Sequence, residues 1–349
     1  MTGERNLAEI FRRLIASTGP ISLAHYMAEA NARYYAGADP LGAGGDFVTA
    51  PEISQLFGEL IGVWLADMWL RAGSEVPVHY VELGPGRGTL ARDALRAMKR
   101  FGLEPQVHLV ETSAALRKLQ LAAVPAAQFH PDLTNVPFEG PILLVANEFL
   151  DALPVRQLIC THGGWREVMV TVECGRFVGA PGSTPMDAAL PEERRRQPEG
   201  TLIETSPAQA AIVHEVAGRL AEQGGAALFV DYGHVEPRTG STFQAVRRHE
   251  KVDPFENPGT ADLTAHVDFA SLAQVVKARG ARWLGTVSQG DWLRALGIEA
   301  RSEALGRSAP QHREALDSAM HRLIEADQMG ELFKVMALAA PGWPDGAGL

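Results

Sequence analysis

The chain has 349 residues, of which 46% are hydrophobic and 21% charged, a composition typical of a globular protein with roughly two domains. Its formal net charge of −10 argues against a general nucleic-acid binder, because phosphate binding needs a basic field. The two cysteines, Cys160 and Cys174, are too few for a disulfide scaffold or a thiolate zinc site. We therefore expect free thiols and no metal site.

The sequence shows no membrane or secretory segment. The longest apolar runs, such as residues 142–146, are far shorter than the ~20 residues of a membrane span. Residues 1–20 carry both arginines and glutamates and lack the apolar centre of a signal peptide, so they predict an amphipathic helix. We therefore expect the cytoplasm of a bacterium.

Residues 1–77 predict a helical extension. A broad apolar stripe at helical spacing runs from Ile53 to Met68. The pattern Thr49-Ala-Pro-Glu52 before it indicates a capping box with proline in the first turn. Residues 42–47 are glycine-rich and predict a flexible loop.

From residue 78 the pattern alternates between short apolar runs and helical segments. The expected strands are 78–83, 106–111, 127–130, 142–146, 226–231, 282–287 and 332–339. The expected helices are 89–101, 113–123, 207–223, 268–279, 291–297 and 309–328. This alternation predicts an α/β fold with a mostly parallel sheet.

Three segments interrupt the alternation. Residues 155–161 and 165–172 predict a β-hairpin insert. Residues 181–200, with Arg194–Arg196, predict a mobile, solvated loop, or a loop that meets an acidic partner. Residues 232–262 form a glycine- and proline-rich stretch that is long for a loop, so it is either functional or disordered.

The main chemical signal is a glycine loop between the first strand and its helix. Gly84, Gly86 and Gly88 permit positive φ and close approach of a ligand, and the helix start offers unpaired N–H groups. A side chain at residue 84 is expected to fill the space that the ligand needs. The third glycine falls one residue early for the dinucleotide fingerprint, and Glu82 precedes the first by two.

Two acidic residues follow the next strands. Glu111 ends the second strand, beside the glycine loop, where a carboxylate can accept both hydroxyls of a ribose; the alternative is a solvated strand end. Asp132-Leu133 follows the third strand, where the carboxylate can meet an adenine amino group. The alternative for Asp132 is a loop cap before Thr134 and Asn135.

Four longer stretches, together with these motifs, carry a family resemblance: residues 45–59, 81–90, 146–154 and 261–269. They resemble the MidA-like family of class I S-adenosylmethionine-dependent methyltransferases, which includes a mitochondrial arginine methyltransferase that assists assembly of respiratory complex I. The resemblance implies a Rossmann-like, seven-stranded sheet closed by an antiparallel last strand, 332–339. It implies a helical N-terminal extension or lid over 1–77 and a methyltransferase domain over 78–349, with β-hairpin and helical inserts at about 155–200 and 288–330.

The resemblance also implies the cofactor S-adenosyl-L-methionine. Its binding residues would be Glu82, Gly84, Gly86, Gly88, Glu111, Asp132, Leu133 and Asn147. Asn147 would contact the amino-acid end of the donor or cap a helix, and these alternatives stay open.

Methyl transfer to an arginine needs carboxylates that hold the guanidinium and accept its N–H groups. Glu148 and Asp151 follow the buried fourth strand and lie three residues apart, so a helical turn would place both on one face as a catalytic clamp. The alternative is that both acids only complement a helix N-terminus.

Further residues are candidates for the lid and the substrate cleft. Residues 46–55 are the expected lid, and its candidate contacts are Thr49, Pro51, Glu52 and Ser54; the alternative is a capped helix packed on the sheet. Tyr232 ends the fifth strand and could line the cleft, and His266 could serve as a base; either could be structural.

These observations predict a methyltransferase that acts on an arginine side chain of a partner protein, such as a respiratory complex I subunit. One alternative is an assembly chaperone that binds the donor with little turnover. Others are a small-molecule methyltransferase and a nicotinamide dehydrogenase, the last disfavoured by the position of the third glycine.

Overall fold

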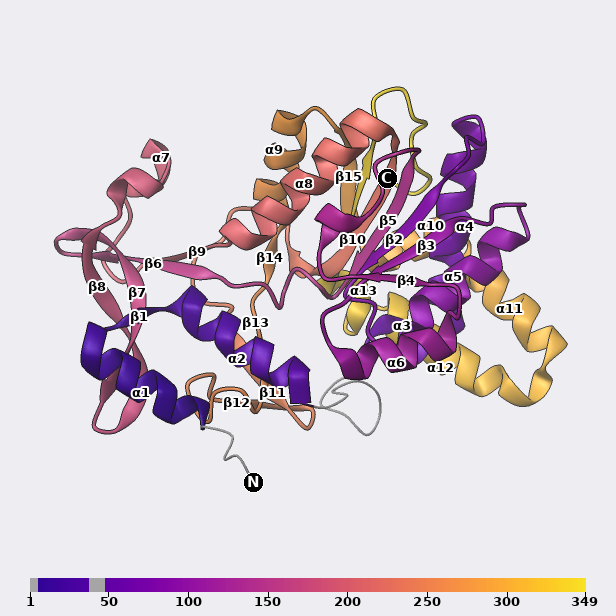
Figure 1. Ribbon diagram of the computed structural model, residues 1–349. Coiled ribbons are helices and arrows are strands. Elements are labelled where there is room, and N and C mark those ends of the chain that lie inside the picture. Colours follow the sequence, from indigo (N-terminus) through magenta and orange to yellow (C-terminus); the bar gives the residue numbers. More distant parts are fainter. Residues whose placement is uncertain (1–5, 38–47) are drawn as a thin grey trace.

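The structure is a computed structural model that describes residues 6–37 and 48–349. Its centre is a sheet of seven strands in the order β15-β16-β10-β5-β2-β3-β4 (Figure 1). The strands are β2 (His79–Leu83), β3 (Gln106–Val110), β4 (Gln128–His130), β5 (Ile142–Asn147), β10 (Gly225–His234), β15 (Arg282–Ser288) and β16 (Phe333–Ala339). Strand β16 is antiparallel to both of its neighbours, and β14 (Val267–Asp268) pairs with the end of β10. The predicted seven-stranded α/β fold with an antiparallel last strand is confirmed.

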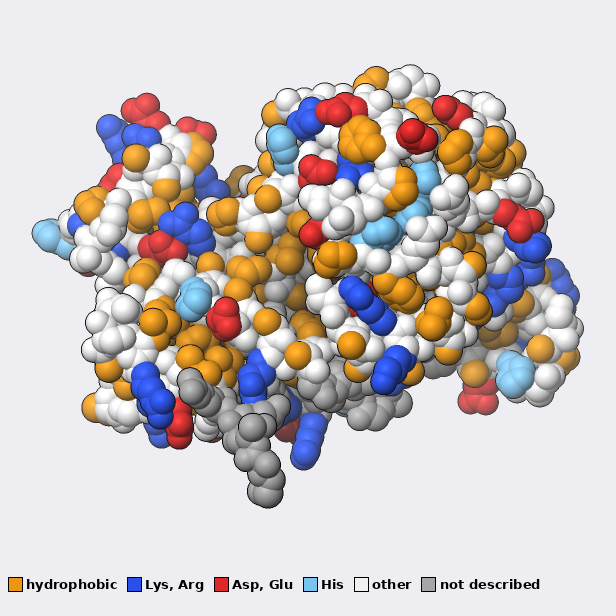
Figure 2. Space-filling model, in the orientation of Figure 1, with side chains coloured by type: hydrophobic (Ala, Val, Ile, Leu, Met, Phe, Trp, Pro, Cys, Tyr) orange, Lys and Arg blue, Asp and Glu red, His pale blue; other side chains and the backbone are white. Residues whose placement is uncertain are grey.

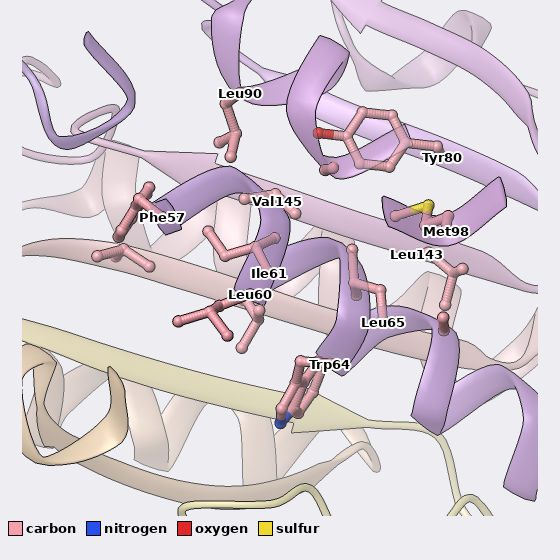
Figure 3. Close-up of a cluster of buried hydrophobic side chains, with 14 of the residues drawn as sticks. Phe57, Leu60, Ile61, Trp64, Leu65, Tyr80, Leu90, Met98, Leu143 and Val145 are labelled. Carbon is pink, nitrogen blue, oxygen red and sulfur yellow. The ribbon is translucent and has the colours of Figure 1, made fainter. Parts of the chain in front are cut away.

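Helices cover both faces of the sheet, and this explains the apolar strand sequences: every residue of β2, β5 and β16 is buried. On one face lie α4 (Gln55–Arg71) and α5 (Thr89–Lys99), together with α10 (Gln289–Ala295), α11 (Ile298–Ser308), α12 (Arg313–Ile324) and α13 (Met329–Leu332). Figure 3 shows Ile61, Trp64 and Leu65 of α4 in the buried cluster that also holds Tyr80 and Val145 of the sheet. On the other face lie α8 (Pro207–Gln223) and α9 (Phe269–Arg279).

Beside the sheet lies a second body, here called the hairpin lobe (Figure 1, left). It contains β1 (Ile21–Ser22), β6 (Arg156–Thr161), β7 (Gly164–Glu173), β8 (Arg176–Pro185), β9 (Leu202–Thr205), β11 (Gln244–Arg247), β12 (Glu250–Val252) and β13 (Asp262–Thr264). Helices α1 (Leu7–Thr18) and α2 (Leu23–Gly37) pack on these strands, and Phe11, Tyr26 and Phe177 form an aromatic core. Figure 2 shows hydrophobic side chains gathered along the junction between this lobe and the sheet.

The N-terminal segment is divided between the two bodies. Helices α1 and α2 belong to the lobe, whereas α4 packs on the sheet. The apolar stripe predicted one helix, but Ser54 is extended and separates α3 (Ala50–Ile53) from α4. The glycine-rich loop predicted over residues 42–47 lies outside the described residues, and the domain division at residue 77 stays a prediction.

Other elements differ from the prediction in three places. Residues 181–200 contain the end of β8 and a turn of helix, α7 (Glu192–Arg195), where a loop was expected. Residues 232–262 contain β11 and β12, which form a three-stranded sheet with β13. Helix α11 was not predicted, and α12 begins at Arg313, after a 3₁₀ turn, and ends at Ile324, so it is shorter than the predicted helix 309–328.

Two further findings concern the composition of the chain. Cys160 and Cys174 are free thiols, as predicted. Among the helices in residues 6–37 and 48–349, none is both long and apolar enough to cross a bilayer.

Candidate functional site

A cavity of about 510 Å³ opens at the carboxyl ends of β2, β3, β4 and β5, the edge where open α/β sheets bind ligands. Helices α2 and α3 cover it. The predicted site residues that line it are Thr49, Pro51, Glu52, Glu82, Gly84, Gly86, Glu111, Asp132, Leu133, Asn147 and Glu148. The sequence therefore placed most of the candidate cofactor residues around one cavity, although their individual roles stay predictions.

The glycine loop has the expected backbone. Gly84, Gly86 and Gly88 have φ of 60°, 53° and 79°, a region that side chains rarely adopt. A Cβ at Gly84 would lie 2.8 Å from Cδ2 of Phe149, a residue that also lines the cavity. A side chain at residue 84 would therefore collide with the ring of Phe149, in addition to the predicted loss of space for the ligand. A Cβ at Gly88 would lie 3.2 Å from Cα of Gln120. Gly88 thus permits close packing on α6 (Ala114–Ala123) and is not among the cavity residues.

Glu111 lines the cavity beside this loop. Its Oε1 accepts from the backbone N–H of Ser113 at 2.7 Å, and its Oε2 accepts from Nε2 of Gln120 at 3.1 Å. The same Nε2 donates to the carbonyl of Gly86 at 2.7 Å. Gln120 thus joins the glycine loop to the candidate ribose acceptor. It was missed, although an amide on the buried stripe of a helix is a signal that could have revealed it.

Asp132 forms the loop cap considered for it, and its contact with an adenine amino group stays a prediction. Its Oδ1 caps a 3₁₀ turn (Leu133–Asn135) by accepting from Thr134 N at 2.9 Å and from Nδ2 of Asn135 at 3.2 Å. Hydrogen bonds from Thr134 lower the pKa of Asp132, which keeps it ionised. The residue also lines the cavity, as does Leu133.

Glu82 is buried below the glycine loop. The hydroxyl of Tyr80 donates to its Oε2 at 2.5 Å, and burial raises the pKa of Glu82 to about 8. A buried carboxyl that accepts from a single neutral donor among the described residues would gain from a positively charged ligand group, which would favour its ionised form.

Residues 147–151 do not form the predicted helical turn. Glu148 has φ of 49°, the left-handed region, and its N–H donates to the carbonyl of Val230 at 2.9 Å. Its side chain lines the cavity, and Oε1 accepts from Ala50 N at 3.3 Å. Asp151 is not a cavity residue; its carboxyl hydrogen-bonds with Tyr232, and its N–H donates to Oδ2 of Asp231 at 3.2 Å. The two acids are neighbours, but through a strained bend.

Burial and neighbouring negative charges raise the pKa values of the carboxyls around this bend. Burial raises the pKa of Glu148 to about 8, and the charges of Asp151 and Asp262 contribute. Burial raises the pKa of Asp151 to about 6, and burial with the charges of Asp151 and Glu148 raises that of Asp231. Such a cluster of like charges is stabilised when a cation binds.

Two buried oxygens in this region have no hydrogen-bond partner among the described residues. They are Oδ1 of Asp151 and Oδ1 of Asn147, two residues that are 5% and 9% exposed. Asn147 lines the cavity, and its Nδ2 donates to Oε1 of Glu148 at 3.4 Å. An unpaired buried oxygen is costly, so Oδ1 of Asn147, which faces the cavity, points to an N–H group of a ligand.

The remaining candidates lie at the cover and behind the site. Thr49, Pro51 and Glu52 of the cover line the cavity, but no capping box forms: Glu52 accepts from the hydroxyl of Thr89 at 2.5 Å and lies 3.8 Å from Arg87. Ser54 does not line the cavity, because its hydroxyl caps α4 by accepting from Leu56 N. Asp46 lies outside the described residues.

Tyr232 and His266 do not line the cavity either. Their rings pack edge to face, with centroids 5.4 Å apart, and Tyr232 hydrogen-bonds with Asp151. Burial lowers the pKa of His266 to about 4, so the ring is neutral at ordinary pH. Tyr232 therefore supports Asp151 from behind, and His266 supports Tyr232.

Two cavity residues of α2, Asn31 and Tyr35, were missed. They lie four residues apart and so share one helix face. Their polar groups on a helix otherwise packed by apolar residues are the only local signal, and no motif spacing connects them to the glycine loop.

Comparison with known proteins identifies the family. Residues 60–287 match the sequence model of a family described as "Putative S-adenosyl-L-methionine-dependent methyltransferase". The chain belongs to this family. It is an α/β methyltransferase that uses S-adenosyl-L-methionine.

Relatives and solved structures agree with this assignment. The chain is 38% identical to the mitochondrial "Protein arginine methyltransferase NDUFAF7 homolog" of Drosophila melanogaster, over 97% of this chain and 85% of the relative. It is 37% identical to the human "Protein arginine methyltransferase NDUFAF7", over 93% and 81%. A "likely methyl transferase" from Burkholderia thailandensis, solved with S-adenosyl-homocysteine, is 32% identical with a TM-score of 0.84, over 95% of this chain and 91% of that one.

The residues of the cavity fit the cofactor. The glycine backbone leaves room for close approach, Glu111 offers carboxylate oxygens at the second strand, and Asn147 presents an unpaired buried oxygen. The cavity volume is in the range of small-molecule sites.

Proposed function

We propose that this methyltransferase transfers the methyl group to an arginine side chain of a partner protein. The observation that supports the proposal is the carboxyl of Glu148, which lines the cavity, together with the carboxyls of Asp151 and Asp231, which are buried behind it around the same strained bend. A guanidinium has five N–H donors and a permanent positive charge, so it matches both the acceptor atoms and the charge of this cluster. The names of the relatives support the same acceptor.

We assign the cofactor's parts to residues by their chemistry. Bound S-adenosyl-L-methionine supplies a reactive methyl group on a sulfonium. Glu111 would hold the ribose, Asp132 and Leu133 the adenine, and Oδ1 of Asn147 the ammonium of the amino-acid end. Gly84 and Gly86 allow the backbone to approach it closely.

Glu148 has two tasks in this proposal. It binds the guanidinium, whose positive charge favours the ionised carboxylate over the neutral acid. Methylation of a guanidinium nitrogen releases one of its protons, and an Oε of Glu148 accepts it. Because the pKa of Glu148 in the free protein is about 8, binding of the acceptor should strengthen as the pH rises toward 8.

We further propose that the partner is a subunit resembling those of respiratory complex I. The test is incubation of extract from a deletion strain with tritiated S-adenosylmethionine and purified enzyme, followed by mass spectrometry of the labelled product. We expect label on arginine of one or a few proteins. Glu148→Gln should lower labelling about a hundredfold while the Kd for S-adenosylhomocysteine stays unchanged.

Glu75→Gln is the matched control, because Glu75 is an exposed glutamate after α4. If the label appeared on a small molecule instead, the proposed protein acceptor would be wrong. Tight binding of S-adenosylhomocysteine without any labelled product would favour an assembly chaperone instead.

A further inference from the structure

Tyr35 of α2 lines the same cavity as Glu148 but comes from the hairpin lobe. Its hydroxyl donates to Oδ1 of Asp262, on β13, at 2.7 Å. A phenol has a single proton to donate, so the remaining capacity of this oxygen is two lone pairs. Burial and the charge of Asp262 raise the pKa of Tyr35, which keeps the hydroxyl protonated.

The position of Tyr35 is held by its neighbour on the helix. Nδ2 of Asn31 donates to the carbonyls of Ala152 and Leu263 at 2.9 and 2.8 Å, and its Oδ1 accepts from Leu263 N at 3.1 Å. One amide therefore connects α2, the strand that carries Asp262, and the segment that follows Glu148. This arrangement fixes the direction of the Tyr35 hydroxyl relative to the carboxyl cluster.

The polar groups at this end of the cavity are acceptors. They are the two carboxyl oxygens of Glu148 and the oxygen of Tyr35, since Oδ1 of Asn147 is assigned to the cofactor. Among the described residues that line the cavity, the cationic side chain is Arg87, and it lies at the cover, 3.8 Å from Glu52. Several acceptors spread around one space suit a group whose N–H donors point in several directions.

We propose that Tyr35, oriented by Asp262, is a specificity-determining residue that selects arginine over lysine as the methyl acceptor. A planar guanidinium spreads five N–H groups over three nitrogens and needs an acceptor on more than one side, whereas an ammonium carries three N–H groups on one atom. Removal of the Tyr35 oxygen leaves a guanidinium N–H unpaired in a desolvated site, and this penalty falls on arginine more than on lysine. The inference rests on the proposed function.

The test compares two peptides, acetyl-Gly-Gly-Arg-Gly-Gly-amide and acetyl-Gly-Gly-Lys-Gly-Gly-amide, as methyl acceptors. For each variant, kcat/KM is measured with both peptides and the Kd for S-adenosylhomocysteine by calorimetry. We expect Tyr35→Phe to lower the arginine-to-lysine ratio of kcat/KM about tenfold and to leave that Kd unchanged. The matched control is Tyr34→Phe, the same chemical change at the neighbouring residue, which does not line the cavity.

A second variant tests the role of Asp262. Asp262→Leu removes the acceptor that orients the Tyr35 hydroxyl, so it should lower the arginine-to-lysine ratio of kcat/KM in the wild-type background. In the Tyr35→Phe background it should not lower this ratio further. If Asp262 had a merely structural role, the two variants would lower the ratio additively. If wild type prefers arginine and Tyr35→Phe keeps the full preference, the inference is wrong while the proposed function stands. If wild type does not prefer arginine, the proposed acceptor is wrong and the inference fails with it.

Discussion

At the scale of single residues, the cofactor end of the cavity depends on how closely α6 approaches the glycine loop. Gly88 has no Cβ, and this permits the backbone of Gln120 to lie where a side chain at 88 would have a 3.2 Å contact. From that position the amide of Gln120 reaches the carbonyl of Gly86 and the carboxylate of Glu111. A glycine with no contact to the cavity thus determines the orientation of the candidate ribose acceptor.

This arrangement predicts the effect of removing the amide. Gln120→Leu keeps the side-chain volume but leaves Glu111 without its side-chain donor, so we expect S-adenosylhomocysteine to bind about tenfold more weakly. Calorimetry would measure the Kd, with Gln106→Leu, at an exposed position at the start of β3, as the control. An unchanged Kd in Gln120→Leu would show that the amide does not orient Glu111.

At the scale of elements, the sheet could be predicted because its strands are buried on both faces. Runs such as 142–147 and 333–339 are apolar throughout, so their pattern is visible without knowledge of the partner strand. Strand β1 has two residues and pairs with β7, about 150 positions later. Such short strands are determined by distant partners, so the local sequence contains little signal for them.

The same distinction applies to the site. Glu82 and Glu111 could be placed because each is next to the end of a predicted strand, and parallel strands end at one edge of the sheet. Asn31 and Tyr35 could not, because the position of α2 over the cavity depends on its packing against the hairpin lobe. The left-handed conformation of Glu148 was also unpredictable, because glutamate is not one of the residues that commonly adopt it and the conformation is held by the N–H bond to the carbonyl of Val230.

The connection between α2 and the site predicts a loss of stability in one variant. Asn31→Leu leaves the N–H of Leu263 and the carbonyls of Ala152 and Leu263 without their partner in a buried region. We expect the free energy of unfolding to fall by about 3 kcal/mol, measured by urea denaturation. Glu29→Leu, at an exposed position of the same helix, is the control. A loss equal to that of the control would mean that the lobe does not depend on Asn31.

At the scale of the whole molecule, the carboxyl cluster favours ligand binding at the expense of the free protein's stability. Burial raises the pKa of Glu148 to about 8 and that of Asp151 to about 6, from ordinary values of 4.5 and 3.8. Between the ordinary and the raised pKa of each group, the unfolded chain has released a proton that the folded chain retains. The free energy of unfolding therefore falls as the pH rises from the ordinary pKa to the raised one. A bound cation would reverse this effect, as expected of a site evolved for function.

Replacement of Glu148 by glutamine should therefore stabilise the free protein in a pH-dependent way. Gln cannot ionise, so Glu148→Gln avoids the proton release that destabilises wild type between about pH 4.5 and 8. We expect the Tm of the variant to exceed that of wild type by roughly 2–4 °C at alkaline pH. Near pH 5 the difference should be much smaller, because Glu148 is then neutral in the folded state. The partial exposure of Glu148 limits the size of the effect. Thermal denaturation across this range measures the difference, with Glu75→Gln, the same change at an exposed glutamate, as the control. A Tm difference that is constant or shrinks with rising pH would show that Glu148 titrates as an ordinary surface carboxyl, and the guanidinium clamp would lose its electrostatic basis.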